Sequence, residues 1–138
     1  MHTSMLSVDL KPGDSVTVPK SAFNLVQHYA VYLGYDCGGS HWMIENIAGR
    51  GVVLTKAADF FAANPSVNKV VPFGGTNEER RQLVQKALYS VGQPYNLINY
   101  NCEHFATSLQ TGKARSRQVE VAFIAAALLL VIGLAVRE

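Results

Sequence analysis

Residues 92–109 read GQPYNLINYNCEHFATSL, and the rest of the chain can be understood from this stretch. Its first half is rich in asparagine and favours a turn, after which an apolar helix is predicted to begin at Cys102. Because Phe105 and Leu109 follow at helical spacing, the thiol should lie on the buried side of that helix. The helix dipole stabilises a thiolate by about 0.3–1 kcal/mol, which is less than roughly one pKa unit. A reactive thiolate would therefore also need a histidine partner, and His28 is the best candidate.

Two segments rich in strand-forming residues, 28–34 and 41–47, predict a β-hairpin around a turn rich in glycine. In the favoured antiparallel register His28 lies directly opposite Glu45, and opposed residues share a face of the sheet. Glu45 could then contact His28, while His41 lies on the same face about two residue pairs further along. A register with His28 opposite His41 would place the glycines inside a strand and is less favourable.

The remaining segments complete an α+β pattern, in which an antiparallel sheet meander packs against helices. Thr55 is expected to cap a short helix, and Thr76 with Glu79 forms the capping-box pattern of a longer one. The other predicted elements are strands over residues 15–18, 52–54 and 67–71, helices over residues 56–63 and 77–91, and a loop over residues 19–27 from which Phe23 and Leu25 pack inward.

The size and composition of the chain fit one domain with an appended segment. The 138 residues divide into an expected catalytic domain over residues 1–118 and an apolar tail over residues 119–138. The formal net charge of +2 is too small to predict nucleic-acid binding. Two cysteines are too few for a disulfide framework, and the first residues lack the features of a signal peptide. A cytosolic location is therefore expected, with a Cys37–Cys102 bridge as the less favoured alternative.

The tail contains sixteen consecutive apolar residues, 121–136. As a helix this run would span roughly 24 Å, less than a hydrocarbon core of about 30 Å, so it predicts a membrane anchor that crosses a thin bilayer or inserts at a tilt. Lys113, Arg115 and Arg117 precede the run, which predicts that the domain stays on the cytoplasmic face. A buried core helix is the alternative, although the run has no polar side.

The candidate site residues also have less specific interpretations. A cysteine on an apolar helix stripe is often only a small core residue, and a lone histidine at a strand start is usually structural. For zinc, Cys102 and His104 are two residues apart and point in different directions on a helix, and no second close ligand pair exists. No metal or other cofactor is therefore expected, and His104 is predicted to form a structural hydrogen bond near the helix start.

Three short motifs resemble one known family. Asn101–Phe105, NCEHF, resembles the signature of the lecithin:retinol acyltransferase family, whose small phospholipase A/acyltransferases belong to the NlpC-type papain-like superfamily. His28–Tyr32, HYAVY, resembles the family's histidine box, and Lys11–Asp14, KPGD, resembles its opening motif. The resemblance covers about residues 11–118, and an apolar tail after a basic linker recurs in the family.

This resemblance implies a circularly permuted papain-like fold and a phospholipid substrate. Cys102 would be the nucleophile that accepts the acyl group and His28 its base, in a ping-pong transfer to water or an amine. The Cys102 backbone N–H would help to hold the oxyanion. Animal members place a second histidine twelve residues after the first, whereas His41 comes thirteen after His28 and Glu45 seventeen. The predicted register favours Glu45 as the third catalytic residue, with His41 as the alternative.

Two other functions fit part of the pattern. An NlpC-type cysteine peptidase or amidase uses the same residue types, but the lack of an export signal and the apolar tail disfavour it. A non-catalytic membrane-bound interaction module would keep Cys102 merely packed in the core. We therefore expect a membrane-anchored thiol phospholipase and acyltransferase on the cytoplasmic face of a membrane.

Overall fold

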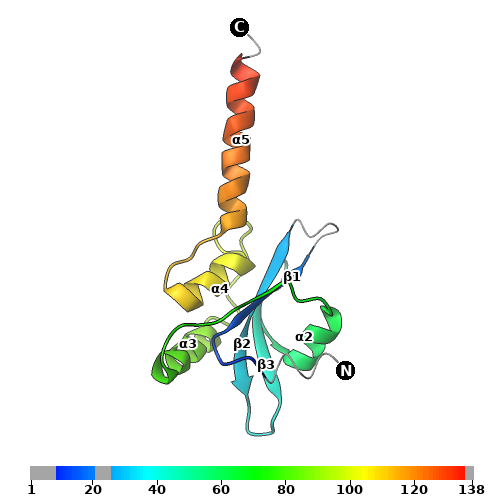
Figure 1. Cartoon of the computed structure of the whole chain (residues 1–138), viewed down its shortest axis with the longest axis vertical. Helices are drawn as coiled ribbons and strands as arrows, with labels where there is room; N and C mark the ends of the chain where they lie inside the picture. Colours follow the sequence, from blue (N-terminus) through cyan, green and yellow to red (C-terminus); the bar gives the residue numbers. More distant parts are fainter. Residues whose placement is uncertain (1–8, 21–25, 136–138) are drawn as a thin grey trace.

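The computed structural model describes residues 9–20 and 26–135, the last two of these by their backbone only. A twisted sheet forms the centre of the molecule, and helices lie on both of its faces (Figure 1). The loop residues Phe23 and Leu25, which were expected to pack inward, lie outside the described residues.

The sheet has five strands in the order β4-β3-β2-β1-β5, and every neighbouring pair is antiparallel. This arrangement confirms the predicted α+β class and the antiparallel meander. The circular permutation of a papain-like fold stays a prediction. The strands are β1 (Ser15–Pro19), β2 (Gln27–Tyr35), β3 (His41–Ile47), β4 (Gly51–Lys56) and β5 (Lys69–Val71).

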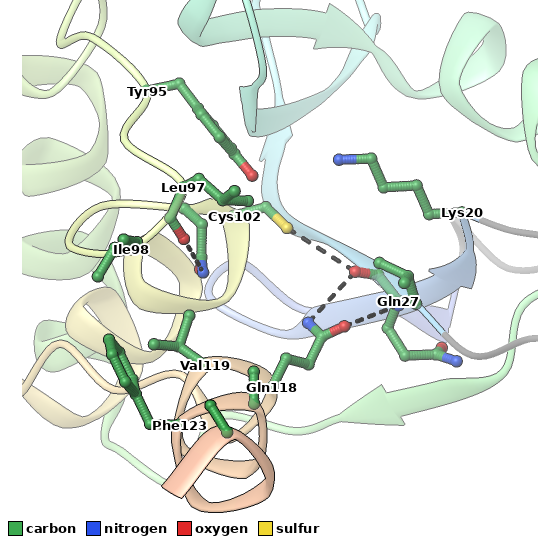
Figure 2. A pocket seen from close by; sticks show the side chains of 13 residues that line it. Lys20, Gln27, Tyr95, Leu97, Ile98, Cys102, Gln118, Val119 and Phe123 are labelled. Carbon is green, nitrogen blue, oxygen red and sulfur yellow. Dashed lines mark hydrogen bonds between the residues drawn. The ribbon is translucent and has the colours of Figure 1, made fainter. Parts of the chain in front are cut away.

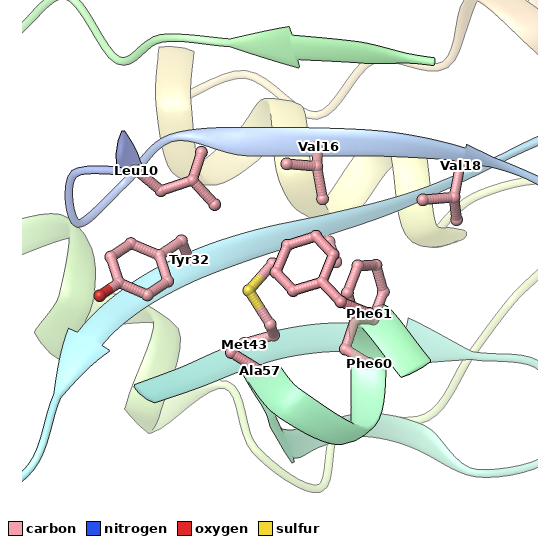
Figure 3. Close-up of a cluster of buried hydrophobic side chains, with 9 residues drawn as sticks. Leu10, Val16, Val18, Tyr32, Met43, Ala57, Phe60 and Phe61 are labelled. Carbon is pink, nitrogen blue, oxygen red and sulfur yellow. The ribbon is translucent and has the colours of Figure 1, made fainter. Parts of the chain in front are cut away.

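Alternating residues of β2 enter two hydrophobic clusters, one on each face of the sheet. Ala30 and Tyr32 face α2 (Ala57–Ala63), where Phe60 and Phe61 pack against Met43 and the valines of β1 (Figure 3). Val31 belongs to the cluster on the other face, beneath α3 (Asn77–Tyr89) and α4 (Cys102–Thr111). Because period-two alternation sends successive side chains to opposite faces, β2 forms part of both cores.

The register between β2 and β3 differs from the predicted one. Glu45 lies opposite Ala30, not His28, and the pairing shifts by one residue between Tyr32 and Gly34. The turn explains the difference, because Asp36 accepts hydrogen bonds from the backbone N–H groups of Gly38 and Ser40 and so centres the hairpin further along the chain. His28 and Glu45 remain on the same face, as diagonal rather than direct neighbours.

The predicted cap is correct for one helix and wrong for another. The capping box of α3 is confirmed, since Thr76 accepts from the backbone N–H of Glu79 and the Glu79 carboxylate accepts from Thr76. The predicted cap at Thr55 is wrong. Thr55 belongs to β4, where its backbone pairs with Met43, and the residue at the start of α2 is Lys56, without a side-chain cap.

The last helix, α5 (Arg117–Ala135), extends away from the sheet (Figure 1). Its large apolar side chains between residues 121 and 132 are more than half exposed, for example Ile124 and Leu128. Within the part of the chain that the structure describes, no helix has both the length and the apolar character needed to cross a membrane. The spanning anchor predicted over residues 121–136 is therefore not supported, and residue 136 itself lies outside the described part.

Candidate active site

The cysteine lies at the first residue of α4, as predicted, and its neighbours hold the start of that helix in place. The Asn101 side chain accepts from the backbone N–H of His104 at 3.0 Å, and the Asn101 N–H donates to His104 Nδ1 at 3.3 Å. This reciprocal pair satisfies two backbone donors that a helix start otherwise leaves without partners. His104 therefore forms a hydrogen bond at the helix start, as predicted. At the other end, Gly112 ends the helix in the left-handed conformation with φ 74°.

The Cys102 thiol is buried against the first residues of β2. Its side chain is only 4% exposed, and Sγ lies 3.9 Å from the carbonyl oxygen of Gln27 (Figure 2). The backbone N–H of Tyr29 also interacts with the sulfur and favours its thiolate form. Cys37 is exposed, and both cysteines are free, so the alternative of a bridge between them is wrong.

An imidazole and a carboxylate complete the constellation around the sulfur. His28 Nε2 lies 2.8 Å from Glu45 Oε1, and the two side chains are only 13% and 7% exposed. The other carboxylate oxygen, Glu45 Oε2, accepts a hydrogen bond from the Thr55 hydroxyl. With Nε2 engaged by Glu45, His28 has Nδ1 left to interact with Cys102, and this interaction helps to raise the pKa of the imidazole. Four elements, α4, β2, β3 and β4, therefore contribute to one hydrogen-bonded chain.

The pKa values of the pair favour a thiolate beside an imidazolium. Burial alone lowers the pKa of His28, but its hydrogen bonds and charge interactions with Cys102 and Glu45 outweigh burial and raise the pKa to about 9. Burial alone raises the pKa of the Cys102 thiol, but the hydrogen bond and positive charge of His28 bring it below its usual value. The lowered pKa favours the thiolate of Cys102, which is the nucleophilic form of a cysteine.

His41 does not join this chain of side chains. It begins β3, four residues from Glu45 along the strand, which corresponds to roughly 13 Å. Its Nδ1 is hydrogen-bonded to the Tyr32 hydroxyl at 2.5 Å, and its ring stacks on that tyrosine with 5.9 Å between the centroids. Of the two candidates for the third residue, the structure brings only Glu45 to His28.

An apolar cavity of about 420 Å³ opens beside Cys102. One wall comes from the loop before α4, and another comes from the first turns of α5 (Figure 2). The described residues that line it are Lys20, Val26, Gln27, Tyr95, Leu97, Ile98, Asn101, Cys102, Gln118, Val119, Ala122, Phe123 and Ala126. The sulfur therefore faces a space that suits an apolar ligand.

Sequence reasoning missed two parts of this site. It did not assign Thr55 to the Glu45 carboxylate, because that contact depends on the pairing of β3 with β4. It also did not predict that Gln118 belongs to the site. The Gln118 side-chain amide accepts from the Gln27 N–H and donates to the Gln27 carbonyl oxygen. Among the described residues, no group of three or more histidine, cysteine and acidic side chains is placed to hold a metal ion.

Cysteine-dependent hydrolases and acyltransferases use this arrangement: a thiol at a helix N-terminus interacts with an imidazole, and a carboxylate holds that imidazole in place. Comparison with known proteins narrows this class. The sequence profile of the lecithin retinol acyltransferase family matches residues 8–115, and the chain belongs to that family. The resemblance drawn from the NCEHF motif is thereby confirmed.

The chain is also similar to individual members with assigned names. It is 25% identical to phospholipase A and acyltransferase 4 of Homo sapiens over an alignment of 142 residues, gaps included. The alignment covers 91% of this chain and 85% of the relative. It is 28% identical to phospholipase A and acyltransferase 3 of Homo sapiens over 134 residues, which cover 84% of this chain and 80% of the relative. The protein of the same name from Pongo abelii gives the same values.

Proposed function

We propose that this protein is a thiol-dependent phospholipase A and acyltransferase that acts on glycerophospholipids through an acyl-cysteine intermediate. One observation carries the proposal: Cys102 and His28 interact closely enough to shift each other's pKa, Glu45 holds His28 at 2.8 Å, and Cys102 lines an apolar cavity. The names of the human relatives support a lipid ester as the substrate and acyl transfer as the reaction.

In the first half of the reaction, the Cys102 thiolate attacks the carbonyl carbon of the ester and forms a tetrahedral adduct. The oxyanion of this adduct accepts a hydrogen bond from the Cys102 backbone N–H, at the positive end of the α4 dipole. The His28 imidazolium then gives its proton to the departing alkoxide oxygen as the carbon–oxygen bond breaks. A lysophospholipid leaves, and the acyl group remains on sulfur as a thioester.

In the second half, water or an amine attacks the thioester carbonyl. His28, now neutral, takes the proton of the attacking group, and the carbon–sulfur bond breaks to restore the thiolate and the imidazolium. Glu45 stabilises the imidazolium and holds the ring so that Nδ1 faces the sulfur. Water as acceptor releases a fatty acid, and an amine releases an amide.

The intermediate provides the direct test of this function. The full-length protein, mixed with phosphatidylcholine and rapidly acidified, is expected to gain the mass of one acyl group, and peptide mapping should place the adduct on Cys102. Neutral hydroxylamine should remove it, because thioesters react with hydroxylamine much faster than amides do. A protein that releases fatty acid without ever carrying an acyl group on this cysteine would contradict the mechanism.

Exchanging Glu45 for glutamine tests the identity of the third residue. The carboxylate helps to raise the pKa of His28 to about 9, so its loss should let the imidazolium deprotonate at lower pH. Activity depends on that imidazolium, so we expect the alkaline limb of the kcat/KM profile of Glu45→Gln to move to lower pH. Its maximum should fall by about tenfold to a hundredfold. The measurement is fatty-acid release across a pH series.

The matched control is His41→Gln, which changes the other candidate for the same role. Because His41 is bonded to Tyr32 at the far end of β3, its replacement should leave the alkaline limb in place. An alkaline limb that moves in His41→Gln and stays fixed in Glu45→Gln would reverse the assignment.

A further inference from the structure

One face of α5 forms a wall of the cavity beside Cys102. Val119, Ala122, Phe123 and Ala126 line it, and they recur at the spacing that puts residues on one side of a helix. From first to last they extend along roughly 10 Å of the helix axis. Figure 2 shows Val119 and Phe123 on the same side of the sulfur, with Lys20 and Tyr95 across it.

The first turn of α5 is hydrogen-bonded to the site and does not merely rest against it. Gln118 Oε1 accepts from the Gln27 N–H at 3.0 Å, and its Nε2 donates to the Gln27 carbonyl oxygen that also faces the thiol (Figure 2). Gln27 directly precedes His28 in β2. The start of α5 is therefore fixed relative to both the imidazole and the sulfur.

A buried carboxylate holds this junction from the other side. Glu103 is 5% exposed, and its Oε2 accepts hydrogen bonds from the Ser116 hydroxyl, the Gln118 N–H and the Gln118 amide. Its Oε1 accepts from the Tyr29 hydroxyl at 3.1 Å. Since a buried carboxylate is costly without such partners, this set of bonds strongly favours one position of the α5 start.

We propose that the fatty acyl chain of the substrate lies in this cavity along α5, and that Ala122, Phe123 and Ala126 determine which chain lengths are accepted. The inference rests on the function proposed above, because it assigns a binding surface to the same reaction. It also means that the expected domain boundary after residue 118 would cut through the substrate site. The start of α5 is part of the enzyme's active site and not only a tail.

The chemistry of the walls favours an acyl chain over a peptide. A peptide would bring backbone N–H and C=O groups against apolar side chains, where they would lack hydrogen-bonding partners. An acyl chain has no such hydrogen-bonding groups along its length. Among the described lining residues other than the Cys102 nucleophile, only Lys20 carries a charge, and its ammonium group has the sign that a phosphodiester requires. The cavity thus complements both ends of a phospholipid.

Filling the cavity from α5 tests this assignment. Ala122→Trp and Ala126→Trp should lower kcat/KM for a phosphatidylcholine with palmitoyl chains by at least about tenfold relative to one with butanoyl chains, because an indole occupies the space of the distal chain. Ala125→Trp is the matched control, since Ala125 is exposed on the same helix and does not line the cavity. It should leave the ratio unchanged. Both lipids are presented in mixed detergent micelles to the full-length protein.

A second pair of variants removes a contact instead of adding one. Phe123 and Leu128 are equally exposed, at 60% and 59%, but only Phe123 lines the cavity. Phe123→Ala should change the ratio of palmitoyl to butanoyl turnover, and Leu128→Ala should not. Because both side chains are largely exposed, we expect alanine at either position to leave the fold intact, so this pair gives a result even if the tryptophan variants fail to fold.

The two proposals fail in different ways. If Cys102→Ala leaves lipid turnover intact, the proposed function is lost. If Cys102→Ala abolishes turnover while cavity and control variants show the same chain-length profile, only the role of α5 is overturned.

Discussion

Cys102→Ser is expected to lower kcat/KM for fatty-acid release from phosphatidylcholine by at least about a thousandfold. The serine hydroxyl fits the space of the thiol, so the buried start of α4 should keep its structure. Its pKa is far above that of a thiol, however, and the imidazolium of His28 cannot hold it as an anion at neutral pH. Release is measured with the purified full-length protein, and circular dichroism checks the fold.

The chain offers a matched control for this substitution at its second cysteine. Cys37 is exposed in the turn between β2 and β3, away from the cavity, so Cys37→Ser should retain full activity. A loss of activity in Cys37→Ser, or its retention in Cys102→Ser, would show that the buried sulfur is not the nucleophile. In that case the packed, non-catalytic interpretation of Cys102 would be the better one.

Local patterns in the sequence predicted the elements that carry the site. The strands β2 and β3 were predicted from their high content of strand-forming residues. The start of α4 follows from Asn101, whose side chain caps the helix that begins with the cysteine. The contact between His28 and Glu45 was predicted from a wrong register. It still forms because the true register differs by two residues, which keeps both side chains on the same face of the sheet.

The contacts that the sequence did not predict all depend on how distant segments meet. The hairpin register depends on the Asp36 side chain and on an irregularity inside β2, neither of which has a reliable local pattern. The contact of α5 with Gln27 arises because the chain turns back after Gly112, where Ser116 and Gln118 reach the buried Glu103. An apolar run such as the tail indicates only that its surface needs a partner, and not which one.

His28→Gln is expected to reduce lipid turnover by about a thousandfold and to change the ionisation of the cysteine at the same time. The imidazolium is the main group that lowers the pKa of Cys102 against the opposing effect of burial. Glutamine fits a similar space but carries no positive charge, so the thiol of the variant should have a raised pKa. Iodoacetamide, which reacts with the thiolate, reports this directly as the pH dependence of alkylation at Cys102.

The alkylation experiment is best done in a Cys37→Ser background, so that Cys102 is the sole thiol in the chain. With His28 present, alkylation should already be fast near neutral pH; in His28→Gln its midpoint should move to higher pH. A residue that only supported the fold would affect turnover without moving that midpoint. His41→Gln supplies the comparison, because His41 contacts Tyr32 and lies roughly 13 Å along β3 from Glu45. An equal shift in both histidine variants would contradict the assignment of His28 as the specific charged partner of the thiol.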